Sequence, residues 1–171
     1  MRLLAVDPGL ANAGLVLFEG KRIADVRTCK TAPEGPRPTF TAAVQRGEEI
    51  ARQIREYGAE IGTVDVVVAE TYVDMGGGHL RMREGKPIPN RWTTPLAIGL
   101  IIPALRDLTE DGEIVWQPAD IVMTRYGQYK RLWALGQTGV VTGDIALRND
   151  HLRSAAAHGL FYLDTRKAVR A

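Results

Sequence analysis

Short runs of apolar residues divide the chain into segments whose periodicity predicts strands alternating with helices. A continuous apolar run of four residues leads into Asp7-Pro8-Gly9, and a second apolar run follows this turn. Apolar residues at consecutive positions are typical of a strand buried on both faces, so the two runs predict a central strand paired with its neighbour in a hairpin. The expected strands are residues 3–6, 14–18, 22–28, 64–69 and 113–117.

Three longer segments have apolar residues at helical spacing: 39–57, 94–108 and 149–162. The second is apolar almost all round and needs cover on more than one side. It therefore predicts either a subunit interface or a helix enclosed within one domain. In the third, small residues predict close packing on the sheet, and Asn149 or Asp150 is the expected N-cap. This alternation of strands and helices predicts an α/β fold.

Composition predicts one globular domain spanning residues 1–171. Hydrophobic residues make up 45% of the 171 positions and charged residues 25%. The net charge of +2 is small, so binding to nucleic acid would depend on local basic patches. The one cysteine, Cys29, excludes an internal disulfide and a zinc site built of cysteines. No apolar run is long enough to span a bilayer and no signal-peptide pattern is present, so we expect a cytoplasmic protein with no membrane partner.

Two of the buried strands end in an acidic residue. Asp7 follows the first strand, and Glu70 follows the strand at 64–69. Asp7 alone also fits a turn-capping role before Pro8-Gly9. Burying a carboxylate is costly unless it is paired or binds a metal, so two such acids indicate a site at the strand ends.

Basic and aromatic residues are interleaved in two segments, 73–92 and 125–133. Cations contact phosphates and aromatic rings stack on bases, so both segments suit nucleic-acid binding. A solvated loop and an amphipathic helix, respectively, are the alternatives. The residues expected to contact DNA are His79, Arg81, Arg83, Lys86, Arg91, Trp92, Arg125, Tyr129, Lys130 and Arg131.

The last helix carries His151, Ser154 and His158 at spacings of three and four, which places them on one face. Residues of these types at such positions are commonly solvated. They become candidate site residues because the two strand-end acids, Asp7 and Glu70, require partners.

Taken together, these motifs resemble the RuvC Holliday junction resolvases of the RNase H-like superfamily, which occur in bacteria and bacteriophages. The resemblance covers nearly the whole chain, and its most specific part is Val6-Asp7-Pro8-Gly9. Glu70 corresponds to the second acid of the family. The last helix resembles the family's His-x-x-Asp form, with His151 at the first position and Ser154 at the second.

The resemblance implies an RNase H-like mixed sheet flanked by helices and a metal-dependent endonuclease that resolves four-way DNA junctions in recombination and repair. It also implies a homodimer that binds branched DNA in the cytoplasm of a bacterium or a phage-infected host. The implied catalytic and metal-binding residues are Asp7, Glu70, His151 and Ser154, with two Mg²⁺ or Mn²⁺ ions per site. Carboxylates on rigid strand ends suit such ions, and a histidine suits Mn²⁺ at least as well.

Ser154 departs from the family pattern, because a carboxylate is expected at that position. Asp144, Asp150 or His158 could compensate, or the chain could be an inactivated form. A different register would pair Asp150 with Arg153, but His151 and Ser154 share a face and fit better.

Other functions stay open beside the resolvase. They are a junction-binding protein without catalysis and a related nuclease acting on other branched DNA or on RNA–DNA hybrids. A sugar-kinase-like domain also begins with Asp-x-Gly after a strand, but 171 residues leave no room for its second half.

Overall fold

The computed structural model describes residues 1–31, 39–71, 82–83, 86–87, 93–126 and 147–169. They form a five-stranded sheet of order β3-β2-β1-β4-β7 and a short hairpin of two further strands. The strands of the sheet are β1 (Arg2–Asp7), β2 (Asn12–Glu19), β3 (Arg22–Lys30), β4 (Val66–Thr71) and β7 (Ile114–Pro118). The hairpin consists of β5 (Met82–Arg83) and β6 (Lys86–Pro87).

The sheet is mixed, and β1 lies at its centre. β1 pairs antiparallel with β2, which pairs antiparallel with β3. On its other edge β1 pairs parallel with β4, and β4 pairs parallel with β7. The carboxyl ends of β1, β4 and β7 therefore meet at one edge of the sheet.

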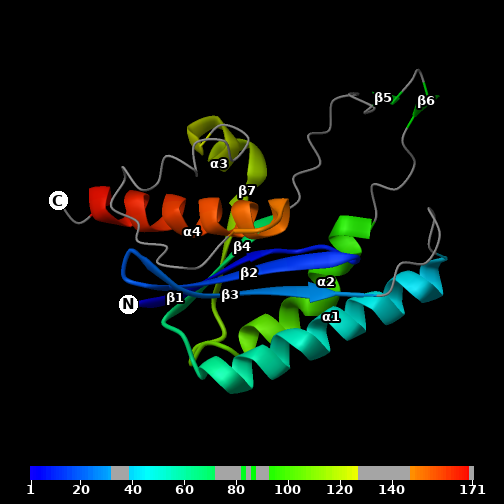
Figure 1. The fold of residues 1–171 in the computed structure, drawn as a ribbon, viewed down its shortest axis with the longest axis horizontal. Coiled ribbons are helices and arrows are strands. Elements are labelled where there is room, and N and C mark those ends of the chain that lie inside the picture. The colour runs from blue at the N-terminus through cyan, green and yellow to red at the C-terminus, as the bar shows by residue number, and fades with distance from the viewer. Residues whose placement is uncertain (32–38, 72–81, 84–85, 88–92, 127–146, 170–171) are drawn as a thin grey trace.

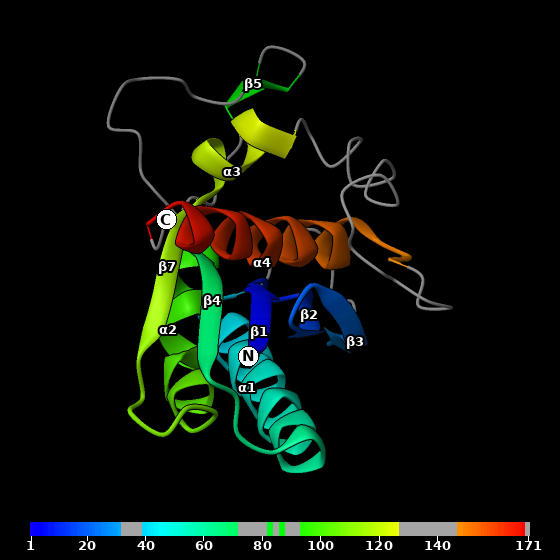
Figure 2. The ribbon, with the colours of Figure 1, turned by 90° about the vertical axis from the view of Figure 1, so that its left-hand side faces the viewer.

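Helices cover both faces of the sheet (Figure 1). The helices α1 (Phe40–Ile61) and α2 (Thr93–Arg106) lie on one face, and α4 (Asp150–Val169) lies across the other. The end-on view in Figure 2 shows these three layers, with α3 (Ala119–Tyr126) beside α4. None of the described helices is both long enough and apolar enough to span a membrane.

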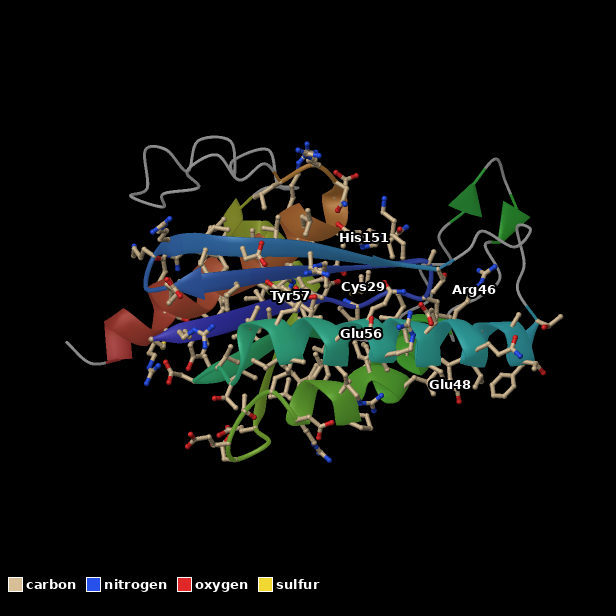
Figure 3. The ribbon with its side chains drawn as sticks, turned by 60° about the horizontal axis from the view of Figure 1, so that its bottom comes forward. Cys29, Arg46, Glu48, Glu56, Tyr57 and His151 are labelled. Carbon is tan, nitrogen blue, oxygen red and sulfur yellow. The ribbon has the colours of Figure 1, made fainter. Side chains whose placement is uncertain are left out.

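The alternation of side chains along a strand explains why the strands are apolar at every position. Leu3 and Ala5 belong to the core beneath α4, whereas Leu4 and Val6 belong to the core shared with α1 and α2. Both faces of β1 are thus buried. Figure 3 shows Tyr57 on the α1 side of the sheet and His151 on the opposite side.

Two glycines let α4 lie almost directly on the sheet. A Cβ atom on Gly159 would lie 2.4 Å from Cε2 of Phe18 and 3.0 Å from Cβ of Ala5. A Cβ atom on Gly14 would lie 2.4 Å from the carbonyl oxygen of His151. The predicted close packing of this helix is confirmed, and Gly14 sets the position of its first turn.

The five predicted strands and three predicted long helices are all present, with bounds shifted by a few residues, and the short β5–β6 hairpin within the predicted 73–92 loop was not predicted. Helix α4 extends to Val169, seven residues past the predicted end, and α3 was not predicted. Asn149 is confirmed as the N-cap of α4, because its Oδ1 accepts a hydrogen bond of 2.9 Å from the amide of Leu152. The prediction that α2 could be enclosed within the domain holds for one face, where Ile101 and Leu105 pack in the α1 core.

Candidate functional site

The two strand-end acids lie side by side on the α4 face of the sheet. Val6 pairs with Ala69 in the parallel register of β1 and β4, so Asp7 and Glu70 occupy neighbouring positions one residue further on. Because alternate residues share a face, Asp7 follows Ala5 and Glu70 follows Val68 toward α4. Asp7 is the last residue of β1, and its side chain is only 13% exposed.

The first turn of α4 brings His151 to Asp7. Nδ1 of His151 lies 2.9 Å from Oδ2 of Asp7. The contact depends on Gly14, which leaves room for the His151 backbone, and on the Asn149 cap, which fixes where the helix begins. Gly9 lies close to the His151 ring, because a Cβ atom on Gly9 would lie 3.6 Å from Cε1 of His151.

The next two turns of α4 approach Glu70. The hydroxyl of Ser154 donates a hydrogen bond of 2.8 Å to Oε2 of Glu70. One turn further on, Nε2 of His158 lies 3.4 Å from the same oxygen. The structure therefore brings together all four residues of the predicted catalytic set and adds His158.

Asp150 stands apart from this cluster. Its side chain is 85% exposed and its Oδ1 pairs with Nη1 of Arg153 at 3.1 Å. Helix α4 thus presents Ser154 to Glu70, while Arg153 contacts Asp150. Asp144, the other acid considered in the sequence, lies outside the described residues.

Gln117 is a site neighbour that the sequence analysis missed. It lies beside Glu70 in the parallel register of β4 and β7, and its Oε1 is 3.1 Å from Nδ1 of His158. The available signal was its position, because Gln117, like Asp7 and Glu70, lies near the carboxyl end of a parallel strand.

Burial and contacts shift the pKa values of Asp7 and Glu70 in opposite directions. Burial raises the pKa of Asp7 above its usual range and outweighs the hydrogen bond with His151, while repulsion from Glu70 raises it further. Burial alone would also raise the pKa of Glu70. The close approach of His158 and the hydrogen bond from Ser154, together with the charge of the His158 and His151 imidazoles, lower that pKa below its usual value. Glu70 is therefore the more acidic member of the pair.

The pKa of His151 is raised, chiefly by its hydrogen bond with Asp7 and against the effect of burial. Protonated His151 therefore stabilises the metal-free fold below its unfolded-state pKa of about 6.5, and this contribution disappears as pH rises through the folded-state pKa. In EDTA we expect the Tm of wild type to exceed that of His151→Asn by more at pH 6 than at pH 8. A difference that grows toward pH 8 in thermal melts would contradict this.

The donor set fits a divalent cation in its chemistry, although the side chains contact one another. Asp7 and Glu70 offer hard oxygen atoms and His151 offers an imidazole nitrogen, a combination suited to Mg²⁺ or Mn²⁺. Within the described part of the chain, no group of three or more His, Cys, Asp or Glu residues is arranged as a ready metal cage. The present contact engages only Oδ2 of Asp7 and Nδ1 of His151, so a cation bound by both residues would use their other atoms or displace this contact.

The basic residues predicted to contact DNA are only partly described. Arg125 lies on α3, where its Nη2 is 3.8 Å from Oδ2 of Asp164 and its guanidinium stacks 5.9 Å from the Phe161 ring. Arg83 and Lys86 are backbone partners in the register of the β5–β6 hairpin. The other seven lie outside the described residues: His79, Arg81, Arg91, Trp92, Tyr129, Lys130 and Arg131.

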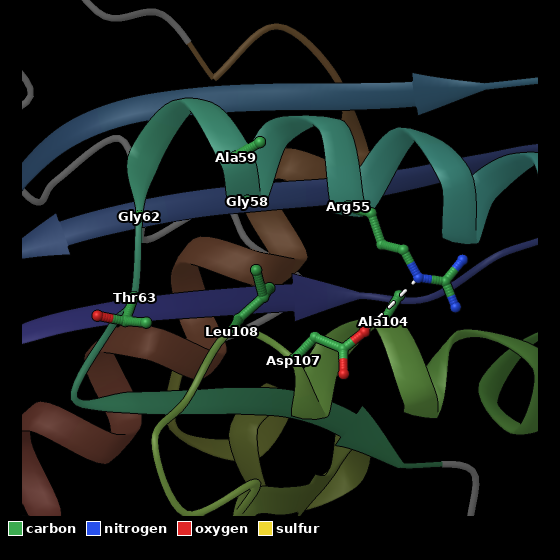
Figure 4. A pocket seen from close by; sticks show the side chains of 8 residues that line it. All are labelled: Arg55, Gly58, Ala59, Gly62, Thr63, Ala104, Asp107 and Leu108. Carbon is green, nitrogen blue, oxygen red and sulfur yellow. Dashed lines mark ion pairs between the residues drawn. The ribbon is translucent and has the colours of Figure 1, made fainter.

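A pocket of about 350 Å³ lies away from this cluster, between α1 and α2 (Figure 4). Its wall includes Gly58, Ala59 and Leu108, and an ion pair of 3.6 Å joins Arg55 and Asp107 across it. It occupies the face of the sheet opposite to Asp7. The pocket therefore takes no part in the site at the strand ends.

The fold is that of solved RuvC structures. The chain aligns with Thermus thermophilus RuvC in complex with a Holliday junction substrate at a TM-score of 0.67 and 20% identity, over 98% of this chain and 96% of that one. A second Thermus thermophilus RuvC structure aligns at a TM-score of 0.64 and 21% identity, over 98% and 97%. No protein-family model matches the sequence, and no curated protein matches it. The mixed sheet flanked by helices is therefore the RuvC, RNase H-like fold.

Proposed function

We propose that the protein is a structure-selective, metal-dependent endonuclease that cleaves four-way DNA junctions. The observation that carries this proposal is the placement of Asp7 and Glu70 on adjacent parallel strands, with His151 and Ser154 of α4 against them. A fold shared with RuvC over nearly the whole chain, including a structure bound to a junction, supports the choice of substrate.

Asp7 and Glu70 would hold the cation, with His151 as a further ligand or as a base. Two such cations, when bound, activate the attacking water and neutralise charge on the phosphate. In the present contact Nδ1 of His151 is held by Asp7, so Nε2 is the atom that can accept a proton from a water molecule. A carboxylate that orients an imidazole in this way fixes both its tautomer and its direction.

Ser154 supports a second candidate, a protein that binds junctions and cleaves them weakly or not at all. Its hydroxyl supplies no negative charge, and it is engaged with Glu70 at 2.8 Å. With a neutral residue here the site has one anionic ligand fewer than the family pattern, which lowers its affinity for divalent cations.

Cleavage of a mobile four-way junction, compared with a linear duplex of the same sequence, distinguishes the candidates. We expect symmetric nicking of the junction in Mg²⁺ or Mn²⁺ and none in EDTA. Tight junction binding without nicking would favour the second candidate. Equal affinity for junction and duplex would refute both.

The predicted basic residues are proposed to contact the arms of the junction. Arg83, Lys86 and Arg125 lie in described elements, and the remaining candidates lie outside the described residues. Contacts of this kind neutralise phosphates, so junction affinity should fall steeply with salt.

We further propose that the outward face of α2 forms a dimer interface, since paired nicks need two sites. Pro95, Gly99 and Pro103 are exposed on this face, and Ile98 and Ile102 are partly exposed. A Cβ on Gly99 would meet nothing within 4 Å, so a larger side chain there fits the protomer.

Gly99→Glu is expected to convert the dimer to a monomer, because a charge would be buried between the two copies. Sedimentation velocity measures the change, and the Tm of the variant should show that the protomer still folds. Ala59→Glu, at an exposed position of α1, is the matched control and should leave the dimer intact. A Gly99→Glu protein that sediments like wild type would place the interface elsewhere.

A further inference from the structure

His158 is a fully buried imidazole with a polar partner on each side. It lies on α4 one turn after Ser154 and is 0% exposed. Its Nδ1 is 3.1 Å from Oε1 of Gln117, and its Nε2 is 3.4 Å from Oε2 of Glu70. Nε2 is also the one buried side-chain nitrogen or oxygen, among the described residues, that has no hydrogen bond of normal geometry.

The strand register explains how one side chain reaches both partners. Gln117 and Glu70 are direct neighbours on β7 and β4. Each lies two positions after a valine, Val115 or Val68, that packs beneath α4, so both side chains are on that face. His158 therefore sits above a pair of polar side chains at the same height in the sheet. The row Gln117–His158–Glu70 runs across two strands and ends at the candidate site.

The carboxylate of Glu70 beside Nε2 of His158 requires that this nitrogen carry a proton. Without it, a nitrogen lone pair would point at the Glu70 carboxylate inside the core, where the repulsion is poorly screened. The amide of Gln117 accommodates either state of the other nitrogen, since it can present its oxygen to an N–H or its NH₂ group to a lone pair. Gln117 thus allows Nε2–H to be directed at Glu70.

We infer that His158 is a positioning residue for Glu70, held in place by Gln117. This inference rests on the proposed function, in which Glu70 is a cation ligand. The two α4 side chains that approach Glu70, Ser154 and His158, both approach Oε2, which leaves Oε1 for a cation. Residues that orient a ligand in this way typically change metal affinity by about 10- to 100-fold when they are lost.

A double-mutant cycle in EDTA tests the contact without any metal. The cycle combines His158→Leu with Glu70→Gln and measures urea unfolding of the four proteins. We expect the two changes to be coupled by about 2- to 100-fold in the unfolding equilibrium constant. Additive effects would overturn the inference, whatever the protein's activity.

Mn²⁺ titration by calorimetry or by electron paramagnetic resonance tests the positioning role. His158→Leu should weaken Mn²⁺ binding by about 10- to 100-fold, and His158→Gln, which keeps an amide donor, should recover most of it. Leu163→Ala is the control, because it removes packing from the same helix and core without touching Glu70. It should bind Mn²⁺ like wild type.

The outcomes separate this inference from the proposed function. Coupling in the cycle together with lost Mn²⁺ affinity supports both. Coupling with unchanged Mn²⁺ affinity in His158→Leu overturns the positioning role and leaves a purely structural contact. If the cycle shows coupling but the wild-type protein binds no Mn²⁺, the contact between His158 and Glu70 is supported and the proposed function is not.

Discussion

Ser154→Asp is expected to raise the rate of junction cleavage by about a hundredfold or more, or about 2.7 kcal/mol in activation free energy. The new carboxylate would stand beside Glu70, where the Ser154 hydroxyl now lies 2.8 Å from Oε2, and would complete the set of anionic ligands. Single-turnover cleavage of a four-way junction in Mn²⁺ measures the change.

The same substitution should destabilise the metal-free protein, because it replaces a hydrogen-bond donor with a second carboxylate in a buried place. Ser154 is 2% exposed. We expect a loss of about 2 kcal/mol, which is roughly 4–8 °C in Tm for a chain of this size. Mn²⁺ at about 100 times its Kd should restore about 2.7 kcal/mol.

Ser154→Ala separates the charge from the hydrogen bond. It removes the donor to Glu70 and adds no ligand, so it should neither raise cleavage nor make the Tm more sensitive to Mn²⁺. If Ser154→Asp were as inactive as Ser154→Ala while still folded, the proposed role of this position would be wrong.

Asp7→Asn is expected to reduce cleavage by at least about a thousandfold, or about 4 kcal/mol in activation free energy. Asp7 is the central acid of the site, and it also holds His151 at 2.9 Å, so the change removes a cation ligand and the orientation of the imidazole together. Burial and Glu70 raise the pKa of Asp7, so its ionised form opposes folding at neutral pH. The variant should therefore stay folded.

Junction binding in EDTA distinguishes this loss from a failure to bind DNA. Removing a negative charge from the site should leave affinity unchanged or increase it. Asp107→Asn is the matched control, since this acid is 67% exposed on α2's side of the sheet and forms only a surface ion pair. Cleavage by Asp7→Asn within tenfold of the control would contradict the assignment of the site.

The periodicity of apolar residues predicted most of the strands and helices. It did so because β1 and β4 are buried on both faces and therefore appear in the sequence as continuous apolar runs. The two acids were found for the same reason: a carboxylate directly after such a run is unusual. Residues 119–126 were missed because α3 is short and has only a weak apolar stripe, with Ile121 49% exposed. The last turns of α4 were missed because polar residues such as Asp164 and Arg166 dominate them.

Pairings across the sheet could not be predicted from the sequence. His158 has the same spacing from Ser154 whether it faces solvent or the core, and only the register of β4 with β7 places Gln117 and Glu70 beneath it. The Asn149 cap was predictable because its signal is local. The partners of His158 depend on strands about 40 and 90 residues away, as the 41-residue separation from Gln117 illustrates.

The close packing of α4 on the sheet also has a consequence for the order in which the site forms during synthesis. Asp7 and His151 are separated by 144 residues, and Glu70 and Ser154 by 84. Contacts this distant in sequence form late, after the entropy of closing long loops has been overcome. In a nascent chain that has already paired β1 with β4, Asp7 and Glu70 therefore lie without their α4 partners beside an uncovered apolar face. Docking of α4 then completes the core and the site in one step. Hydrogen exchange should then show the α4 amides and the strand ends gaining protection together.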